Sequence, residues 1–244
     1  MSSKAAKPSR KEKNTRGRAP EKRAPQAQRS RYEQHLARRR RRRFILLLLA
    51  VIGMAIIGLG VIFFRSTGTS TGNSLAGQYA FQVGNPGPGA QAPEFTLPAT
   101  NGSTFDLAAQ HGKTVLLYFQ EGLTCQPCWD QLKDLQTHLD QFHALGITSV
   151  VSITTDPLAQ LKQKVTDEGL SIPVLSDLSL VVSRAYTANS YGMMGDSRDG
   201  HTFVLVGPDG RIAWRADYGG APNYTMDVPI PNLLADIKAG LQGK

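Results

Sequence analysis

The strongest chemical signal in the chain is the segment Thr124-Cys125-Gln126-Pro127-Cys128-Trp129, which holds its only two cysteines. A Cys-x-x-Cys pair at a helix start places the first sulfur beside unpaired backbone N–H groups and the positive end of the helix dipole. Both stabilise a thiolate, so we expect Cys125 to be exposed and nucleophilic. Cys128 falls on the inward side of the helix and is expected to resolve a mixed disulfide formed on Cys125. Pro127 suits the first turn, where its missing N–H costs nothing.

Two other interpretations of the cysteine pair are weaker. A static disulfide would close a very short loop and would therefore stabilise the fold little. A structural zinc site needs four ligands, and the chain has no second cysteine pair to supply them. The pattern therefore favours a redox site. Among its neighbours, Thr124 adjoins the motif, Trp129 is expected to cover the site, and Glu121 could accept a proton, although a charged loop residue is expected at the surface.

The surrounding sequence predicts the elements that would position this pair. The wholly apolar run Val115–Phe119 is typical of a strand buried on both faces. An amphipathic helix that ends at Gly146 follows, because apolar residues recur at spacings of 4, 3, 4 and 3. Those residues are Cys128, Leu132, Leu135, Leu139 and Phe142.

The rest of the body alternates between strand and helix patterns before a final hairpin and helix. This order predicts an α/β three-layer domain with a mixed sheet. We expect strands at 147–155 and 172–175 and a hairpin formed by 202–206 and 211–216. Helices are expected at 156–168, 177–185 and 231–239. Asp156 is expected to cap the helix at 156–168.

Charge is distributed unevenly along the 244 residues, whose net charge is +9. Residues 1–65 hold 18 Lys and Arg against three Asp and Glu, whereas the remainder is acidic. Residues 1–43 are poor in aliphatic side chains, which predicts a disordered basic tail. Its six final arginines directly precede an apolar segment, so they indicate a cytoplasmic topology signal rather than a nucleic-acid site.

That apolar segment, residues 44–64, holds 21 uncharged residues and would reach about 31 Å as a helix, the thickness of a bilayer core. We predict a single transmembrane helix in a bacterial cell membrane, with the N-terminus cytoplasmic and the C-terminal domain extracytoplasmic. Residues 65–86 are expected to form a flexible linker, and residues 87–244 the redox domain.

Several segments together resemble the thioredoxin-fold redoxins, including the peroxiredoxins of the alkyl hydroperoxide reductase and thiol-specific antioxidant type. The resemblance covers about residues 87–218 and implies a thioredoxin-like fold with a redox-active disulfide and no bound organic cofactor. The segments that carry it are 89–97, 112–119, Cys125-Gln-Pro-Cys128, 172–177 with 185–186, and 201–210.

Two departures from the family patterns concern the site itself. Peroxiredoxins carry Pro-x-x-x-Thr-x-x-Cys, but counting back from Cys128 gives Glu121 and Cys125 at the Pro and Thr positions, and counting back from Cys125 also fails. Thioredoxins carry a cis-proline before the hairpin, where this chain has His201. His201 could stabilise the thiolate, move protons or bind a metal, or it could be an inert buried histidine.

The resulting hypothesis is a membrane-tethered thiol–disulfide oxidoreductase that acts on protein thiols or disulfides or exchanges electrons with a membrane donor. One alternative is a thiol peroxidase. The other is a copper-binding chaperone of the Sco type, with Cys125, Cys128 and His201 as ligands and methionines 193, 194 and 226 nearby.

Overall fold

The computed structural model describes residues 49, 52–54 and 75–243. The chain divides into two units, residues 1–70 and 71–244. The predicted basic tail and nearly all of the predicted membrane helix at 44–64 lie outside the described residues. In the part that is described, no helix is both long and apolar enough to cross a membrane.

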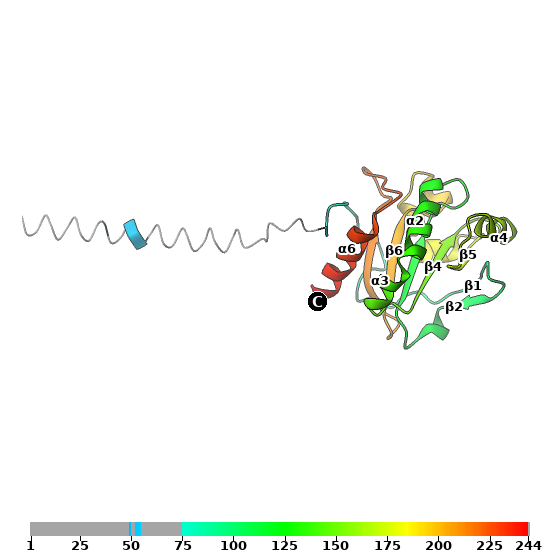
Figure 1. Ribbon diagram of the computed structural model, residues 1–244, viewed down its shortest axis with the longest axis horizontal. Helices are drawn as coiled ribbons and strands as arrows, with labels where there is room; N and C mark the ends of the chain where they lie inside the picture. The colour runs from blue at the N-terminus through cyan, green and yellow to red at the C-terminus, as the bar shows by residue number, and fades with distance from the viewer. Residues whose placement is uncertain (1–48, 50–51, 55–74, 244) are drawn as a thin grey trace, which may run out of the picture. The chain divides into compact units, whose positions relative to one another are not determined.

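A five-stranded mixed sheet forms the centre of the second unit, with strand order β5-β4-β3-β6-β7. β3 is the middle strand, parallel to β4 and antiparallel to β6, which comes from much later in the chain (Figure 1). This arrangement confirms the predicted α/β fold with a mixed sheet. The strands are β3 (Val115–Phe119), β4 (Ser149–Thr154), β5 (Val174–Ser176), β6 (Thr202–Val206) and β7 (Ile212–Asp217).

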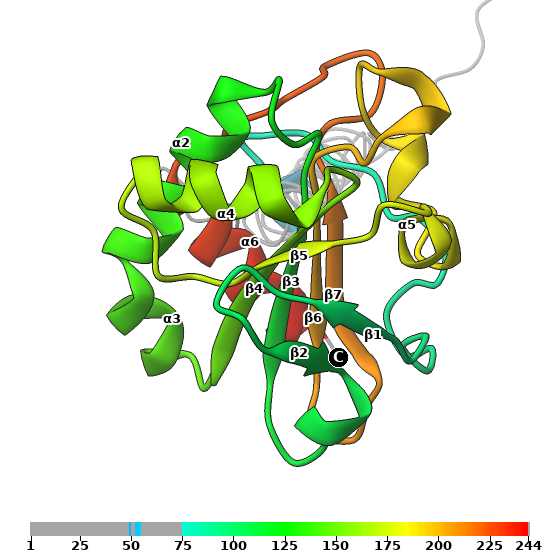
Figure 2. The same cartoon turned by 90° about the vertical axis from the view of Figure 1, so that its right-hand side faces the viewer.

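Each face of the sheet carries its own apolar core. One face is covered by four helices (Figure 2): α2 (Gln126–Thr137), α3 (Leu139–Ala144), α4 (Leu158–Asp167) and α6 (Ile230–Gln242). The other is covered by α5 (Val181–Ala185) and a hairpin that the sequence did not predict, made of β1 (Thr96–Pro98) and β2 (Thr104–Asp106). Short 3-10 turns η1, η2 and η3 occupy Ala108–Gln110, Ala188–Ser190 and Gly195–Ser197.

Side-chain competition for backbone groups explains where the helices differ from the predictions. The single helix expected up to Gly146 is broken at His138, whose ring Nδ1 lies 2.8 Å from the Asp134 carbonyl oxygen. The helix expected from Asp177 begins later, at Val181, because the Asp177 carboxylate accepts the backbone N–H of Ser183 at 2.7 Å.

The flexible linker predicted for residues 65–86 is wrong for its described part, residues 75–86. Gln82 pairs with Asp217 through two backbone hydrogen bonds of 3.0 and 2.9 Å, which adds a short bridge at the edge of β7. Phe81 packs edge-on against Tyr218, with 5.3 Å between ring centroids. The Gly, Ser and Thr residues that suggested a linker lie mostly in residues 65–74, whereas Phe81 and the backbone of residues 75–86 contact the domain.

Candidate active site

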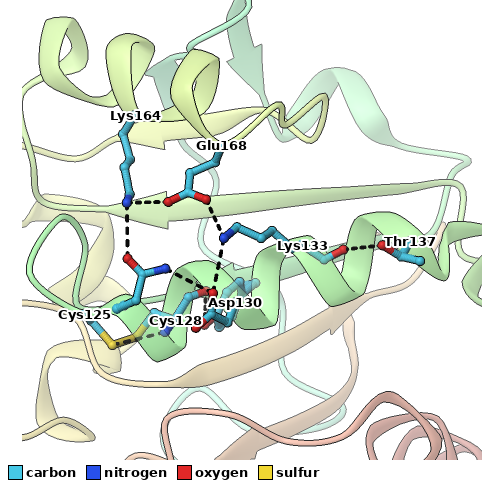
Figure 3. Close-up of polar contacts among 9 residues, drawn as sticks. Cys125, Cys128, Asp130, Lys133, Thr137, Lys164 and Glu168 are labelled. Carbon is cyan, nitrogen blue, oxygen red and sulfur yellow. Dashed lines mark hydrogen bonds and ion pairs between the residues drawn. A yellow bond between two sulfur atoms is a disulfide. The ribbon is translucent and has the colours of Figure 1, made fainter.

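The two cysteines form a disulfide where the loop after β3 enters α2 (Figure 3). Cys125 is the N-cap of α2, and its sulfur accepts the backbone N–H of Cys128 at 3.3 Å. Pro127 lies in the first turn, as predicted. Both cysteines are buried, against the expectation that Cys125 is exposed, yet Cys125 keeps 6% exposure and Cys128 none. Met226, from the segment before α6, packs with both of them.

The turn that leads to Cys125 depends on a glycine and a buried aspartate. Gly122 has φ +86°, and a Cβ there would lie 1.7 Å from the Asp156 carboxylate. That carboxylate accepts the backbone N–H of Leu123 at 2.8 Å and the Thr154 hydroxyl at 3.0 Å. Its other oxygen pairs with Arg198 at 2.8 Å. Asp156 therefore holds the loop before the cysteines, and the prediction that it caps α4 is wrong, since Pro157 is the N-cap.

Glu121 is buried rather than at the surface, as had been expected for a charged loop residue. Its carboxylate accepts the backbone N–H of Met193 at 2.5 Å, and its backbone carbonyl accepts Arg198 at 3.2 Å. These contacts tie the loop after β3 to the segment around Met193. Glu121 is thereby engaged in holding two loops together.

Trp129 and Thr124 occupy contrasting positions beside the disulfide. Trp129 is fully buried, and its indole N–H donates to the Gly122 carbonyl at 3.0 Å. Lys164 lies 5.5 Å from the centre of its ring. Thr124 is exposed. The indole thus braces the loop before Cys125 from inside the core.

His201 is fully buried beneath α2, at the start of β6. Its Nδ1 lies 3.0 Å from the Tyr118 hydroxyl, which in turn donates to the Cys128 carbonyl at 3.2 Å. Burial lowers the pKa of His201 to about 3, so the ring is neutral at ordinary pH. His201 therefore reaches the second cysteine only through Tyr118.

The copper alternative with Cys125, Cys128 and His201 is not supported by this geometry. Nowhere among the described residues do three His, Cys, Asp or Glu side chains form a group that could hold a metal ion. Met193 and Met194 are exposed, at 57% and 48%. Met226 packs with the cysteines, but Cys125, Cys128 and His201 do not form such a group.

A chain of polar contacts joins the outer side of the Cys-x-x-Cys turn to α4 (Figure 3). Gln126 donates to Asp130 at 3.0 Å and accepts Lys164 at 3.3 Å. Lys164 pairs with Glu168 at 2.6 Å, and Glu168 also pairs with Lys133. Hydrogen bonds from both lysines lower the pKa of Glu168 to about 2. The residue between the cysteines is thereby anchored to a second helix.

An aspartate lies next in sequence to the methionine of the site. Asp227 is exposed and directly follows Met226, which packs with the cysteines. Its pKa is raised by partial burial and by the nearby carboxylates of Asp134 and Asp130 on α2. Asp130 also pairs with Lys133 at 3.2 Å, so this group of carboxylates is partly balanced by a lysine.

Sequence reasoning missed Tyr118, Asp156 and Arg198 as parts of this site, and it named Met226 only beside the copper alternative. Tyr118 was interpreted only as one member of an apolar strand. A usable signal existed for Asp156, because β3 and β4 are parallel neighbours and their carboxyl ends meet at one edge of the sheet. Met226 lies nearly 100 residues from the cysteines in sequence, and the expectation that it lies near them is confirmed by its packing with both.

Comparison with known proteins places these features in a family. A candidate peroxiredoxin of Mycobacterium tuberculosis is 36% identical over 131 residues, covering 51% of this chain and 81% of that protein. Peroxiredoxin Bcp of Escherichia coli is 29% identical, covering 50% of this chain and 79% of that protein. Thiol-disulfide oxidoreductase ResA of Bacillus subtilis is 26% identical, covering 51% of this chain and 64% of that protein.

Among solved structures, peroxidoxin BcpB of Mycobacterium tuberculosis matches with a TM-score of 0.53 and 19% identity, over 65% of this chain and 98% of that one. At that identity the match supports the thioredoxin-like fold alone. The model of the AhpC/TSA family matches residues 88–215, which include both cysteines. The chain belongs to the AhpC/TSA family of thioredoxin-fold redoxins.

Proposed function

We propose that this protein is a thiol–disulfide oxidoreductase in which Cys125 and Cys128 alternate between dithiol and disulfide. The observation that carries the proposal is the disulfide at the start of α2, with the remaining exposure on Cys125. The similarity to proteins named as thiol-disulfide oxidoreductases supports it. Because only a small fraction of Cys125 is exposed, its partners should be small disulfides or disulfides in extended segments.

The exchange reaction needs two displacement steps. In the reduced protein the Cys125 thiolate, stabilised at the helix start, attacks a partner disulfide and releases one partner thiolate. The Cys128 thiolate then attacks the Cys125 sulfur of the mixed disulfide, and the second partner thiolate leaves with a proton. The protein is oxidised by two electrons and the partner is reduced by two. The same steps run backwards when the partner is a dithiol.

Trapping the intermediate tests these roles. We expect reduced Cys128→Ser protein, mixed with glutathione disulfide, to accumulate a glutathione adduct on Cys125 that persists for minutes. Cys125→Ser protein should form its adduct far more slowly because Cys128 is fully buried. Intact-protein mass spectrometry at timed intervals measures both. Faster labelling of Cys128 than of Cys125 would reverse the assignment.

A membrane tether is a separate part of the proposal. It rests on the apolar residues 44–64 and the preceding arginines, and it places residues 66–244 outside a bacterial cell, near a membrane electron donor or secreted protein thiols. Protease added to intact spheroplasts should remove the C-terminal domain and leave the tail protected. A protected domain or a released soluble form would contradict this topology.

Peroxide reduction is the second candidate, and the peroxiredoxin names of several relatives favour it. Against it, Cys125 occupies the position of the threonine hydroxyl when Cys128 is aligned as the peroxide-reactive residue. We expect the reduced protein to react with hydrogen peroxide at a rate near that of a free thiol. Fast, saturable oxidation in a stopped-flow experiment would establish the peroxidase instead.

A further inference from the structure

A buried Tyr–His pair lies directly behind the second cysteine and has no part in the two displacement steps above. Tyr118 comes from β3, and His201 lies just before β6, its neighbour in the sheet. The rings of both residues are fully buried. Phe203 stacks on Tyr118 at 4.6 Å between centroids, and the backbone of His201 is fixed by hydrogen bonds to Tyr191 and Tyr218. The pair is therefore held rigidly.

The hydrogen bonds of this pair fix the direction of each donor. Tyr118 has one hydroxyl proton, and it is donated to the Cys128 carbonyl. The contact of 3.0 Å with His201 therefore requires His201 Nδ1–H to donate to the Tyr118 oxygen. Nε2 then carries no proton and offers only a lone pair. This atom is buried and has no hydrogen-bond partner. Burial keeps the ring neutral by lowering its pKa to about 3.

We propose that Tyr118, oriented by His201, is a positioning residue for the resolving step: it fixes the Cys128 backbone so that the Cys128 sulfur stays in reach of Cys125. The inference rests on the proposed function. It concerns only the second displacement, in which the Cys128–Cys125 bond forms, the bond from Cys125 to the partner sulfur breaks, and the partner leaves as a thiolate. The first displacement uses Cys125 and the helix start and needs no contact with Tyr118.

The geometry explains why this contact acts on one cysteine and not the other. Cys125 is the N-cap and is held by Gly122 through a 3.0 Å backbone hydrogen bond, so its position does not depend on Tyr118. Cys128 lies in the first turn, where one side-chain donor reaches its carbonyl. Once the disulfide opens, that donor remains beside the backbone hydrogen bond from Cys128 to the Cys125 carbonyl, at 3.1 Å. Loss of the Tyr118 contact would loosen the turn and lower the effective concentration of the Cys128 sulfur.

The chain offers a matched control in Tyr186. It too is fully buried, and its hydroxyl donates to a backbone carbonyl, that of Pro93, at 2.9 Å. It lies in the core on the opposite face of the sheet, away from the cysteines. Tyr118→Phe and Tyr186→Phe therefore each remove one tyrosine–carbonyl hydrogen bond, and only the first of these bonds is at the active site. Tyr118→Phe also removes the contact with His201, which the His201 variants test separately.

The experiment mixes reduced protein with excess 5,5′-dithiobis(2-nitrobenzoic acid) in a stopped-flow instrument and follows thionitrobenzoate. Attack by Cys125 releases the first equivalent at a rate proportional to reagent concentration, and resolution by Cys128 releases the second at a rate independent of it. We expect Tyr118→Phe to leave the first phase unchanged and to slow the second about five- to tenfold, the effect of one net hydrogen bond. Tyr186→Phe should change neither phase.

Two His201 variants test the same hydrogen bond from its other end. His201→Leu removes the donor and should slow the second phase as Tyr118→Phe does, while His201→Asn keeps an N–H donor and should restore it to within about twofold. A normal second phase in Tyr118→Phe, or equal slowing of both phases, would overturn the inference. Release of a single equivalent by the wild type would overturn the proposed function itself.

Discussion

The two ends of the central sheet differ sharply in what they bury. At the end where β3, β4 and β5 finish and β6 begins, many polar side chains are buried. At the opposite end the chain reverses through turns such as those at Gly112 and Gly146, both at positive φ with open space around them. The buried polar residues at the first end include Gln120, Glu121, Thr154, Asp156, Asp177, Asp199, His201 and Thr202.

This difference shows which end of the fold gives up stability for function. A buried polar group destabilises the fold unless it is hydrogen-bonded. Most of the buried side-chain atoms that lack a partner in the described part of the chain lie at the cysteine end, on Gln120, Asp177, Asp199 and His201. Burial raises the pKa of Asp199 well above its ordinary value. At the opposite end, the Ser149 hydroxyl at the start of β4 also lacks a partner.

The largest effect we expect comes from comparing a glycine at each end. Gly122→Ala places a methyl group against the Asp156 carboxylate, which three hydrogen-bond donors hold in place. We expect the free energy of unfolding to fall by about 3 kcal/mol or more. Gly146→Ala has a similar φ and meets no atom within 4 Å, so it should lose only about 1 kcal/mol. Urea denaturation of both variants measures the difference.

Equal losses in the two glycine variants would break the comparison. They would mean that backbone conformation alone decides the effect and that the Asp156 carboxylate can move aside. Asp156→Ala combined with Gly122→Ala separates these cases, because it removes the closer of two clashes and leaves the one with the Thr154 hydroxyl, at 2.3 Å. The double variant should then lose less than the sum of the two single losses.

A smaller effect should appear as a pH dependence that originates in His201. The unfolded chain binds a proton at this side chain below its ordinary pKa of 6.5, whereas the folded protein does not until about pH 3. The free energy of unfolding should therefore fall on acidification, by about 2 kcal/mol between pH 6.5 and 5. His201→Asn should flatten this slope, and the exposed His143→Asn should not. A slope unchanged in His201→Asn would contradict the burial of a neutral ring.

Much of the fold could be predicted from the sequence because the patterns involved are local. The strand at 115–119 and the hairpin of β6 and β7 follow from short apolar runs and a Gly-Pro-Asp-Gly turn, and both are confirmed. The hairpin of β1 and β2 was missed because each strand has only three residues. Such short strands depend on tertiary contacts rather than on their own propensity.

Only those parts of the candidate site that lie within one short segment of sequence could be predicted. The Cys-x-x-Cys pair at a helix start and Pro127 in its first turn could be identified from spacing alone. The loop that presents Cys125 is held by Asp156 and Arg198, which lie 31 and 73 residues further along the chain. The pairing of β3 with β4 offered a signal for Asp156, whereas no sequence pattern marks Arg198, which lies in the loop before β6.

The smallest effect should come from the partly exposed charges between α2 and α4, which contrast with the buried groups at the cysteine end. Lys133 and Lys164 lower the pKa of Glu168 to about 2 from 4.5. Their stabilising contribution should therefore be present above about pH 4.5 and be lost as pH falls towards 2. We expect Glu168→Gln to reduce stability slightly at neutral pH and not at all near pH 2.

Salt separates this network from the buried groups. Ions screen exposed pairs, so the difference between Glu168→Gln and wild type should shrink in 1 M sodium chloride, while the effect of Gly122→Ala should persist. Carboxyl carbon NMR shifts followed against pH measure the Glu168 titration directly. A midpoint near 4.5 would show that the lysines do not hold this carboxylate in solution. Gln126, between the cysteines, would then lose the anchor that Lys164 provides.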